Sequence, residues 1–226
     1  MKILYLETSS KNCSVAISDN EKLLCLTEEV SENYKQSESL HTFVEWALEG
    51  AGISIKDIEA VSLGKGPGSY TGLRIGASSA KGFCYGLKIP LVAVNSLESM
   101  IEPFLSQNYD FVIPLVDARR MEVYTAVYDG VTGKEISETE AKVLDETSFE
   151  EFKDKKVIFV GDGAKKAQEI LQLPNAEYNA TIYPSAQYLI NKSLEKINNK
   201  DFEDIAYFEP FYLKDFYGVK KKKSED

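Results

Sequence analysis

The sequence has 226 residues, 43% of them apolar, which is enough for one large domain or two small ones that share a core. With 26 basic and 36 acidic residues the net charge is −10, so the average surface repels a phosphate backbone. Nucleic-acid binding by this chain alone is therefore disfavoured. The exception is a lysine run, Lys220 to Lys223, in a polar tail over residues 214–226, which indicates either a solvated end or a weak contact with RNA or an acidic partner.

Cysteine usage and hydropathy indicate the compartment. The three cysteines, Cys13, Cys25 and Cys84, have neither an even count nor a metal-like spacing, so we expect small buried hydrophobic residues in a reducing compartment. No apolar stretch approaches the ~20 residues needed to cross a bilayer, and residues 1–7 run into a strand-like segment without a signal peptide. These features predict a cytoplasmic protein that does not enter a membrane.

The first half of the chain begins with strand patterns and then changes to a helical period. Alternating or short apolar runs predict strands, and apolar residues at helical spacing predict helices. In chain order we expect strands at 3–8, 13–18 and 22–30 with a turn at Asp19-Asn20, a helix over 40–51 that Gly52 ends, a strand at 58–63, a helix over 71–87, a strand at 90–94 and a helix capped by Ser96.

The second half resembles the first in outline. A strongly apolar strand is again followed by an alternating segment and a turn. In chain order we expect strands at 111–116, 122–128 and 134–143 with a turn at Asp129-Gly130, a short helix near Phe149, a strand at 157–160, a helix opened by residues 161–163 and ending at Leu171, and another beginning at Pro184.

Three strands, a helix, a strand and a helix, given twice, predict two stacked α/β lobes of one ancestral type over residues 1–100 and 101–213. A single mixed sheet is the alternative. The duplicated βββαβα plan resembles the actin-like superfamily of actin, Hsp70 and sugar kinases (ASKHA, with ribonuclease H-like lobes). Fold alone does not settle function.

The glycine-rich segment over residues 64–76 follows a predicted strand and opens a predicted helix, with Ser69 or Thr71 available as its cap. Glycines let a backbone approach another group closely, and a helix N-terminus offers free N–H groups. Anion binding is one interpretation, although the pattern is neither a Walker loop nor a dinucleotide fingerprint.

The helix over residues 71–87 has an unusual face. An interior glycine costs a helix ~1 kcal/mol relative to alanine, so several on one face imply that something packs very close to it. That face would pack either inside this chain or against another subunit. Trp46, just beyond the apolar stripe of the preceding helix, could extend an apolar patch. The residues expected on the glycine-containing face are Gly72, Gly76, Ser79, Phe83 and Gly86.

Residues 66–76, Gly-Pro-Gly-Ser-Tyr-Thr-Gly-Leu-Arg-Ile-Gly, match the signature of the bacterial TsaB (YeaZ) family almost letter for letter. The resemblance covers nearly the whole chain, although Glu7 stands where many members carry Asp and Gln36 where His is common. Further matching stretches are Gln36-Ser37-Glu38, Ala51-Gly52, Lys81-Gly82, Asp117-Ala118-Arg119, Glu122-Val123-Tyr124, Gly161-Asp162-Gly163 and Pro210-Phe211-Tyr212-Leu213.

The resemblance implies an actin-like subunit of the machinery that makes N6-threonylcarbamoyladenosine at position 37 of tRNA. In that family the protein pairs with the catalytic paralogue TsaD, a small ATPase, TsaE, joins the complex, and isolated members homodimerise through the same helical surface. Carried to this chain, the surface consists of the helices over 36–51 and 71–87, and a bulky Gly76→Leu change would abolish pairing while leaving the monomer folded. The implied interface residues are Leu40, Phe43, Trp46, Ala47, Gly72, Arg74, Gly76, Ser79, Ala80 and Phe83.

Catalysis by this chain alone is disfavoured, and we expect no catalytic residue, metal or cofactor. His41 is the only histidine, so neither a two-histidine metal site nor a convincing Ser–His pair can be assembled. A small-molecule kinase is the strongest rival, but the turns that begin each lobe lack the glycine that would let phosphate approach. A structural homodimer is a third interpretation. The candidates for a vestigial nucleotide contact are Glu7, Thr8, Asp117, Gly161, Asp162 and Gly163.

Overall fold

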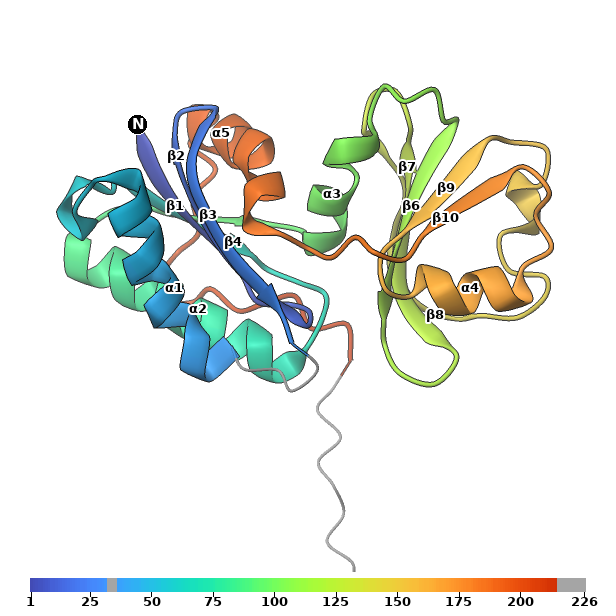
Figure 1. Cartoon of the computed structure of the whole chain (residues 1–226), viewed down its shortest axis with the longest axis horizontal. Helices are drawn as coiled ribbons and strands as arrows, with labels where there is room; N and C mark the ends of the chain where they lie inside the picture. The colour runs from blue at the N-terminus through green and yellow to red at the C-terminus, as the bar shows by residue number, and fades with distance from the viewer. Residues whose placement is uncertain (32–35, 215–226) are drawn as a thin grey trace, which may run out of the picture.

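Two five-stranded sheets lie side by side in the computed structural model, which describes residues 1–31 and 36–214 (Figure 1). The lysine run at residues 220–223 lies outside the described residues. The first half contains β1 (Lys2–Glu7), β2 (Asn12–Asp19), β3 (Lys22–Val30), α1 (Gln36–Ala51), η1 (Ile55–Asp57), β4 (Ala60–Gly64), α2 (Tyr70–Leu87), β5 (Leu91–Val94) and α3 (Ser96–Met100). The second half contains η2 (Glu102–Phe104), β6 (Phe111–Asp117), β7 (Glu122–Asp129), β8 (Glu135–Val143), η3 (Glu150–Phe152), β9 (Val157–Val160), α4 (Ala164–Ile170), β10 (Ala176–Asn179), η4 (Ala186–Leu189) and α5 (Ile190–Asn198).

The two sheets have the same topology. The first runs β3-β2-β1-β4-β5 and the second β8-β7-β6-β9-β10. In each sheet the first three strands in chain order pair with antiparallel neighbours, and the fourth and fifth are added in parallel. For example, β4 pairs in parallel with β1, with Val61 opposite Leu4. The duplicated actin-like plan is therefore confirmed, and the alternative of a single mixed sheet is wrong.

Several local predictions need correction. The N-cap of α3 is Asn95, whose side chain accepts from the Leu97 amide, and Ser96 is the first helical residue. The helix expected near Phe149 is only the short 3-10 turn η3, and the helix expected at Pro184 starts later, as η4 followed by α5. Strand β10 was not predicted, because its sequence, Ala-Glu-Tyr-Asn, is short and largely polar.

Helices cover both faces of the first sheet. On one face α1 and α2 pack on β1, β2 and β4 around side chains such as Leu6, Val15 and Leu63. On the other face η4 and α5 bury Leu189 and Ile197 against the same sheet (Figure 1). The expected boundaries, 1–100 and 101–213, follow the two sheets but assign η4 and α5 to the second lobe, whereas both pack on the first.

The second sheet is covered by shorter elements. Helix α4 packs Ala164 and Ala167 on one face, and α3 with η2 packs Met100 and Phe104 on the other. Because α3 leaves the first sheet and packs on the second, it joins the two lobes (Figure 1). Among the described residues no helix is both long and apolar enough to span a membrane.

Candidate functional site

The glycine-rich loop after β4 packs against the turn between β1 and β2. A Cβ atom on Gly68 would lie 2.1 Å from the Ser9 carbonyl oxygen, and one on Gly72 would lie 2.0 Å from the Thr8 carbonyl oxygen. The Ser69 amide donates to the same Ser9 carbonyl at 2.6 Å. The close approach that glycine permits here is therefore to the chain itself.

Several amides of this loop also donate to groups within the chain. The Gly66 amide donates to Ser96 Oγ at 3.1 Å, and the Gly72 amide donates to Ser69 Oγ at 3.4 Å, so Ser69 is the cap of α2, one of the two residues predicted for that role. Because these donors and the Ser69 amide are already bonded, the anion-binding interpretation finds no support in the loop geometry.

Glu7 lies at the end of β1 with no exposed surface. Its carboxylate accepts from the Ser9 amide and from Ser96 Oγ, both at 2.8 Å. It also fills the space beside Gly64, where a Cβ atom would lie 1.9 Å from Glu7 Oε2. Burial raises the pKa of the Glu7 carboxyl, and the bonds from Ser9 and Ser96 oppose that rise. Glu7 ties the first strand to the start of α3, and Thr8 beside it is equally buried and donates to the Gly72 carbonyl at 2.8 Å.

Most of the predicted interface residues face the interior. The first half of the glycine-containing face of α2 is turned inward, against Thr8, and Ser79 and Phe83 further along meet His41 of α1. Gly86, which was predicted for the same face, is exposed. A Cβ atom on Gly76 would lie 2.4 Å from Thr8 Oγ1, so we expect Gly76→Leu to destabilise the monomer itself, whereas the sequence alone predicted an effect on pairing only. The buried members of the predicted set are Leu40, Phe43, Ala47, Gly72, Gly76 and Ala80.

The opposite face of α2 is exposed, and α1, which packs beside α2 through His41, also carries exposed residues. Tyr85 is 83% exposed and Trp46 is 55% exposed. Two glycines, Gly82 and Gly86, are exposed, and apart from their own turn of helix no atom of the described residues lies within 4 Å of a Cβ placed on them. Of the predicted interface residues, Trp46 and Arg74 are exposed, and Ser79 and Phe83 are half-buried. We call the following set the outer helical surface: Glu45, Trp46, Arg74, Ser78, Gly82, Tyr85 and Gly86.

His41 lies at the seam between α1 and α2. Its Nε2 atom is 3.3 Å from Ser79 Oγ, and its ring lies 5.8 Å from that of Phe83. A serine side chain therefore lies beside His41, a contact that the sequence did not indicate. The pair is exposed, and no contact recorded for the described residues gives His41 the carboxylate partner that orients a catalytic histidine.

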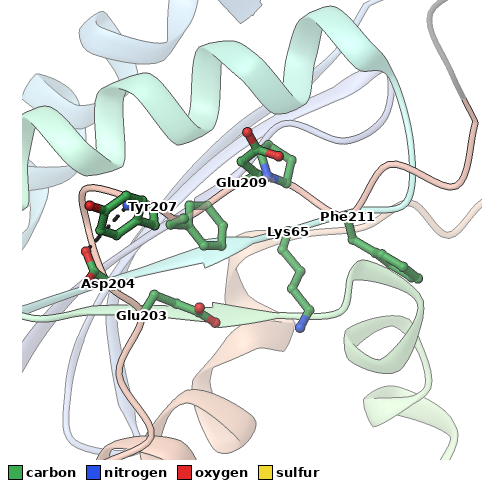
Figure 2. A pocket seen from close by; sticks show the side chains of 8 residues that line it. Lys65, Glu203, Asp204, Tyr207, Glu209 and Phe211 are labelled. Atoms are coloured by element: carbon green, nitrogen blue, oxygen red, sulfur yellow. Dashed lines mark hydrogen bonds between the residues drawn. The ribbon is translucent and has the colours of Figure 1, made fainter.

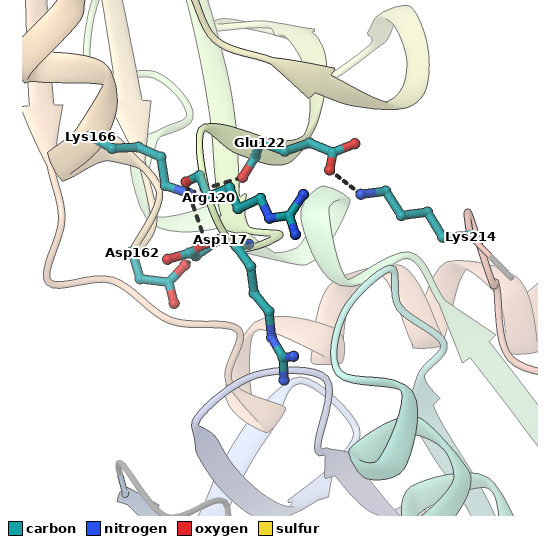
Figure 3. A network of polar contacts seen from close by, with 7 residues as sticks. Asp117, Arg120, Glu122, Asp162, Lys166 and Lys214 are labelled. Atoms are coloured by element: carbon teal, nitrogen blue, oxygen red, sulfur yellow. Dashed lines mark hydrogen bonds and ion pairs between the residues drawn. The ribbon is translucent and has the colours of Figure 1, made fainter. Parts of the chain in front are cut away.

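The candidates for a nucleotide contact form two separate groups. Glu7 and Thr8 are buried in the first lobe, whereas Asp117 and the 161–163 turn meet in the second (Figure 3). The Asp117 amide donates to Asp162 Oδ1 at 2.8 Å. A Cβ atom on Gly161 or Gly163 would lie within 3 Å of the Leu115 carbonyl oxygen, so both glycines serve the packing of this turn on β6.

Lys166 occupies the centre of the second group (Figure 3). Its ammonium donates to Asp117 Oδ1 and to the Arg120 carbonyl at 2.8 Å, and to the Glu122 carbonyl at 2.9 Å. Lys166 supplies the cation that pairs with Asp117, whereas Arg119 contributes its backbone amide, which donates to Asp117 Oδ1. Burial raises the pKa of Asp162, and the Asp117 amide opposes the rise. Nucleotide contact at these residues stays a prediction.

Replacing Lys166 by methionine is expected to lower the free energy of unfolding by roughly 1–3 kcal/mol, because three bonds to a partly buried ammonium are lost. The bonds hold a turn in which Arg119 and Arg120 both have positive φ, 71° and 51°. Urea unfolding measures the change. Lys165→Met, at an exposed neighbouring position of α4, is the control, and equal stability of the two variants would contradict this account.

A cavity of about 410 Å³ that the sequence did not indicate lies between Lys65 and the C-terminal segment. Figure 2 shows the Lys65 side chain extending between Glu203 and Phe211. The segment is held there by the Phe211 amide, which donates to the Lys65 carbonyl at 2.8 Å. Carboxylates outnumber the lysine in the lining, so the cavity does not favour an anion. The segment after Phe211 continues to Lys214, whose ammonium pairs with Glu122 of the second lobe (Figure 3).

Comparisons with known proteins place the chain in a family. A family model described as "TsaD: tRNA N6-adenosine threonylcarbamoyltransferase" matches residues 28–217. The "tRNA threonylcarbamoyladenosine biosynthesis protein TsaB" of Buchnera aphidicola subsp. Acyrthosiphon pisum is 32% identical over 206 residues, 88% of this chain and 91% of the relative. The Bacillus subtilis protein of the same description is 29% identical, over 76% of each chain.

Solved structures agree on the fold. A Pseudomonas aeruginosa protein described as uncharacterized, "with similarity to peptidase YEAZ", superposes with a TM-score of 0.79 at 24% identity, over 94% of this chain and 99% of the other. This structural similarity shows the fold alone, whereas the sequence relatives and the matched family model identify the family. The chain therefore belongs to the TsaB (YeaZ) family, within the wider family that the TsaD model describes.

Proposed function

We propose that this chain acts in tRNA threonylcarbamoyladenosine biosynthesis as a non-catalytic cytoplasmic subunit that pairs with a TsaD-type catalytic paralogue. The names of its relatives support the pathway, and the match to the TsaD model supports a paralogue of shared architecture as the partner. A TsaE-type ATPase completes the complex, tRNA is contacted through the complex, and the isolated chain homodimerises through the surface that the paralogue covers. The two actin-like lobes, with η4 and α5 assigned to the first, serve as a scaffold.

The outer helical surface carries this proposal. Glycine in the interior of a helix costs about 1 kcal/mol relative to alanine, yet Gly82 and Gly86 meet nothing within the described chain that requires them. Beside them the large Tyr85 side chain is 83% exposed, and Trp46 adds a second exposed aromatic ring. Exposed aromatic residues beside small ones suit a surface on which another helix packs closely.

The polar residues support an indirect role in the reaction. Among the described residues no group of three or more His, Cys, Asp and Glu side chains is placed to hold a metal ion. The acid at the start of the second lobe, Asp117, is already paired with Lys166. We propose that the chain orders the active site of the paralogue and helps to form the surface that receives tRNA.

Light scattering of this chain mixed with the TsaD-type paralogue of its own organism tests the proposal. We expect a heterodimer that displaces any homodimer. A Gly82→Leu variant, at a position with open space around it, should stay folded and lose most of the pairing, because the added side chain blocks close helix approach.

The matched control is Gln168→Leu, which adds the same side chain at an exposed position of α4 in the other lobe. It should pair as the unaltered chain does. Pairing of Gly82→Leu at full strength would show that the outer helical surface is not the interface. Absence of any heterodimer from two folded proteins would refute the proposed function.

A further inference from the structure

A second cavity, of about 320 Å³, lies between the edge strand β3 and helix α1. Trp46 stands at its side, and its ring stacks on that of Phe43 with centroids 5.6 Å apart. The hydroxyl-bearing residues Thr27 and Thr42 also line it. The cavity adjoins the outer helical surface, because Trp46 belongs to both.

The two glutamates in its lining have different environments. Glu28 is turned to the far face of the sheet, where its Oε2 atom accepts from Ser14 Oγ at 2.8 Å and from Ser185 Oγ at 2.6 Å. Glu29 lies opposite Cys13, whose side chain packs in the core beneath α1. Paired residues on neighbouring strands point to the same face of a sheet, and side chains alternate between the faces along each strand. Glu29 therefore points to the α1 side, opposite to Glu28, and it is exposed.

The charged residues that the structure describes around this cavity are acidic. Helix α1 carries two exposed glutamates, Glu45 and Glu49, and no lysine or arginine. Glu45 lies one turn after Thr42, and Glu49 lies one turn after Trp46. None of the described lining residues is basic. A carboxylate attracts a cation through its charge and an exposed indole through its ring quadrupole, and this lining contains both.

We infer that this cavity receives a lysine or arginine side chain of the partner subunit, held between the Glu29 carboxylate and the Trp46 ring. The inference rests on the proposed function, since it takes the paralogue as the source of the cation. Charge complementarity is the argument for this occupant. The contact would fix the register of the partner on the outer helical surface, because a shift of the partner along this surface would separate the cation from the carboxylate.

The test is the dissociation constant of the heterodimer at low and high salt. Glu29→Gln keeps the shape of the side chain and removes its charge. We expect it to weaken binding by about five- to tenfold at low salt, with a smaller difference at high salt, where exposed charges are screened. A Trp46→Ala variant should add a further loss at both salt concentrations.

The matched control is Glu138→Gln, on β8, the edge strand of the second sheet that corresponds to β3. It removes the same charge from an exposed strand position and should leave both the affinity and its salt dependence unchanged. If Glu29→Gln also binds with unchanged affinity and salt dependence, the cation site is refuted while the proposed function stands.

A second copy of this chain is the competing occupant, because α2 carries Arg74 and Lys81 as its only charged residues. If Glu29→Gln weakens self-association of the isolated chain and leaves the heterodimer unaffected, the partner-derived cation is refuted. Absence of a heterodimer with the unaltered chain refutes the proposed function and this inference together.

Discussion

Replacing Gly76 by leucine is expected to lower the free energy of unfolding by about 3 kcal/mol or more, because overpacking a filled core forces the backbone apart. A Cβ atom on Gly76 would already lie 2.4 Å from Thr8 Oγ1 and 3.0 Å from Leu63 Cδ1. The Thr8 hydroxyl cannot move freely, since it donates to the Gly72 carbonyl at 2.8 Å. Urea unfolding followed by far-ultraviolet circular dichroism measures the loss.

Gly82→Leu is the control for this prediction, because it places the same side chain on the same helix where the surroundings are open. Its stability should stay within about 1 kcal/mol of the unaltered chain, and leucine is the better helix former. The two variants separate folding from pairing. If Gly76→Leu unfolds at the same urea concentration as Gly82→Leu, the inward orientation of the glycine-containing face is wrong.

Glu7→Ala is expected to destabilise the protein by roughly 2–4 kcal/mol, since it leaves buried donors without an acceptor and opens a cavity. The donors are the Ser9 amide and Ser96 Oγ, each 2.8 Å from the carboxylate. The cavity would open beside Gly64, which the carboxylate now contacts. Thermal and urea unfolding measure the effect. A loss below about 1 kcal/mol would mean that Glu7 does not hold β1 to α3.

Glu7→Gln separates the charge of this residue from its shape. Burial raises the pKa of Glu7 in the folded state, so as pH rises from the ordinary range of a glutamate the unfolded chain loses its proton first. Ionised Glu7 therefore costs stability above that range, and the cost is absent at lower pH, where both states are protonated. The stability of Glu7→Gln relative to the unaltered chain should rise with pH across this window. Parallel pH profiles would contradict the assignment.

The local pattern of the sequence determined the elements and their duplication. Alternating and apolar runs correctly indicated β1 to β9 apart from their exact ends, because burial of one or both faces of a strand imposes that pattern directly. The residues that begin or end two helices were also predicted from the sequence. Ser69 is the cap of α2, and Gly52 follows α1 with φ +67°. The motif over residues 66–76 was sufficient to indicate the family.

Only the tertiary structure decided which way the faces point. The glycines of α2 indicated close packing, but spacing along a helix does not tell whether the neighbour is the same chain or another. Thr8, over sixty residues away in sequence, meets Gly72 and Gly76, so that face is inward and Gly82 with Tyr85 is outward. Glu7 likewise gave no local sign of burial, because its partner Ser96 comes from a distant helix. The sequence also did not indicate that α5 packs on the first sheet, although it follows the second sheet in the chain. Local periodicity records that a face is buried, whereas the identity of what buries it depends on contacts between distant segments.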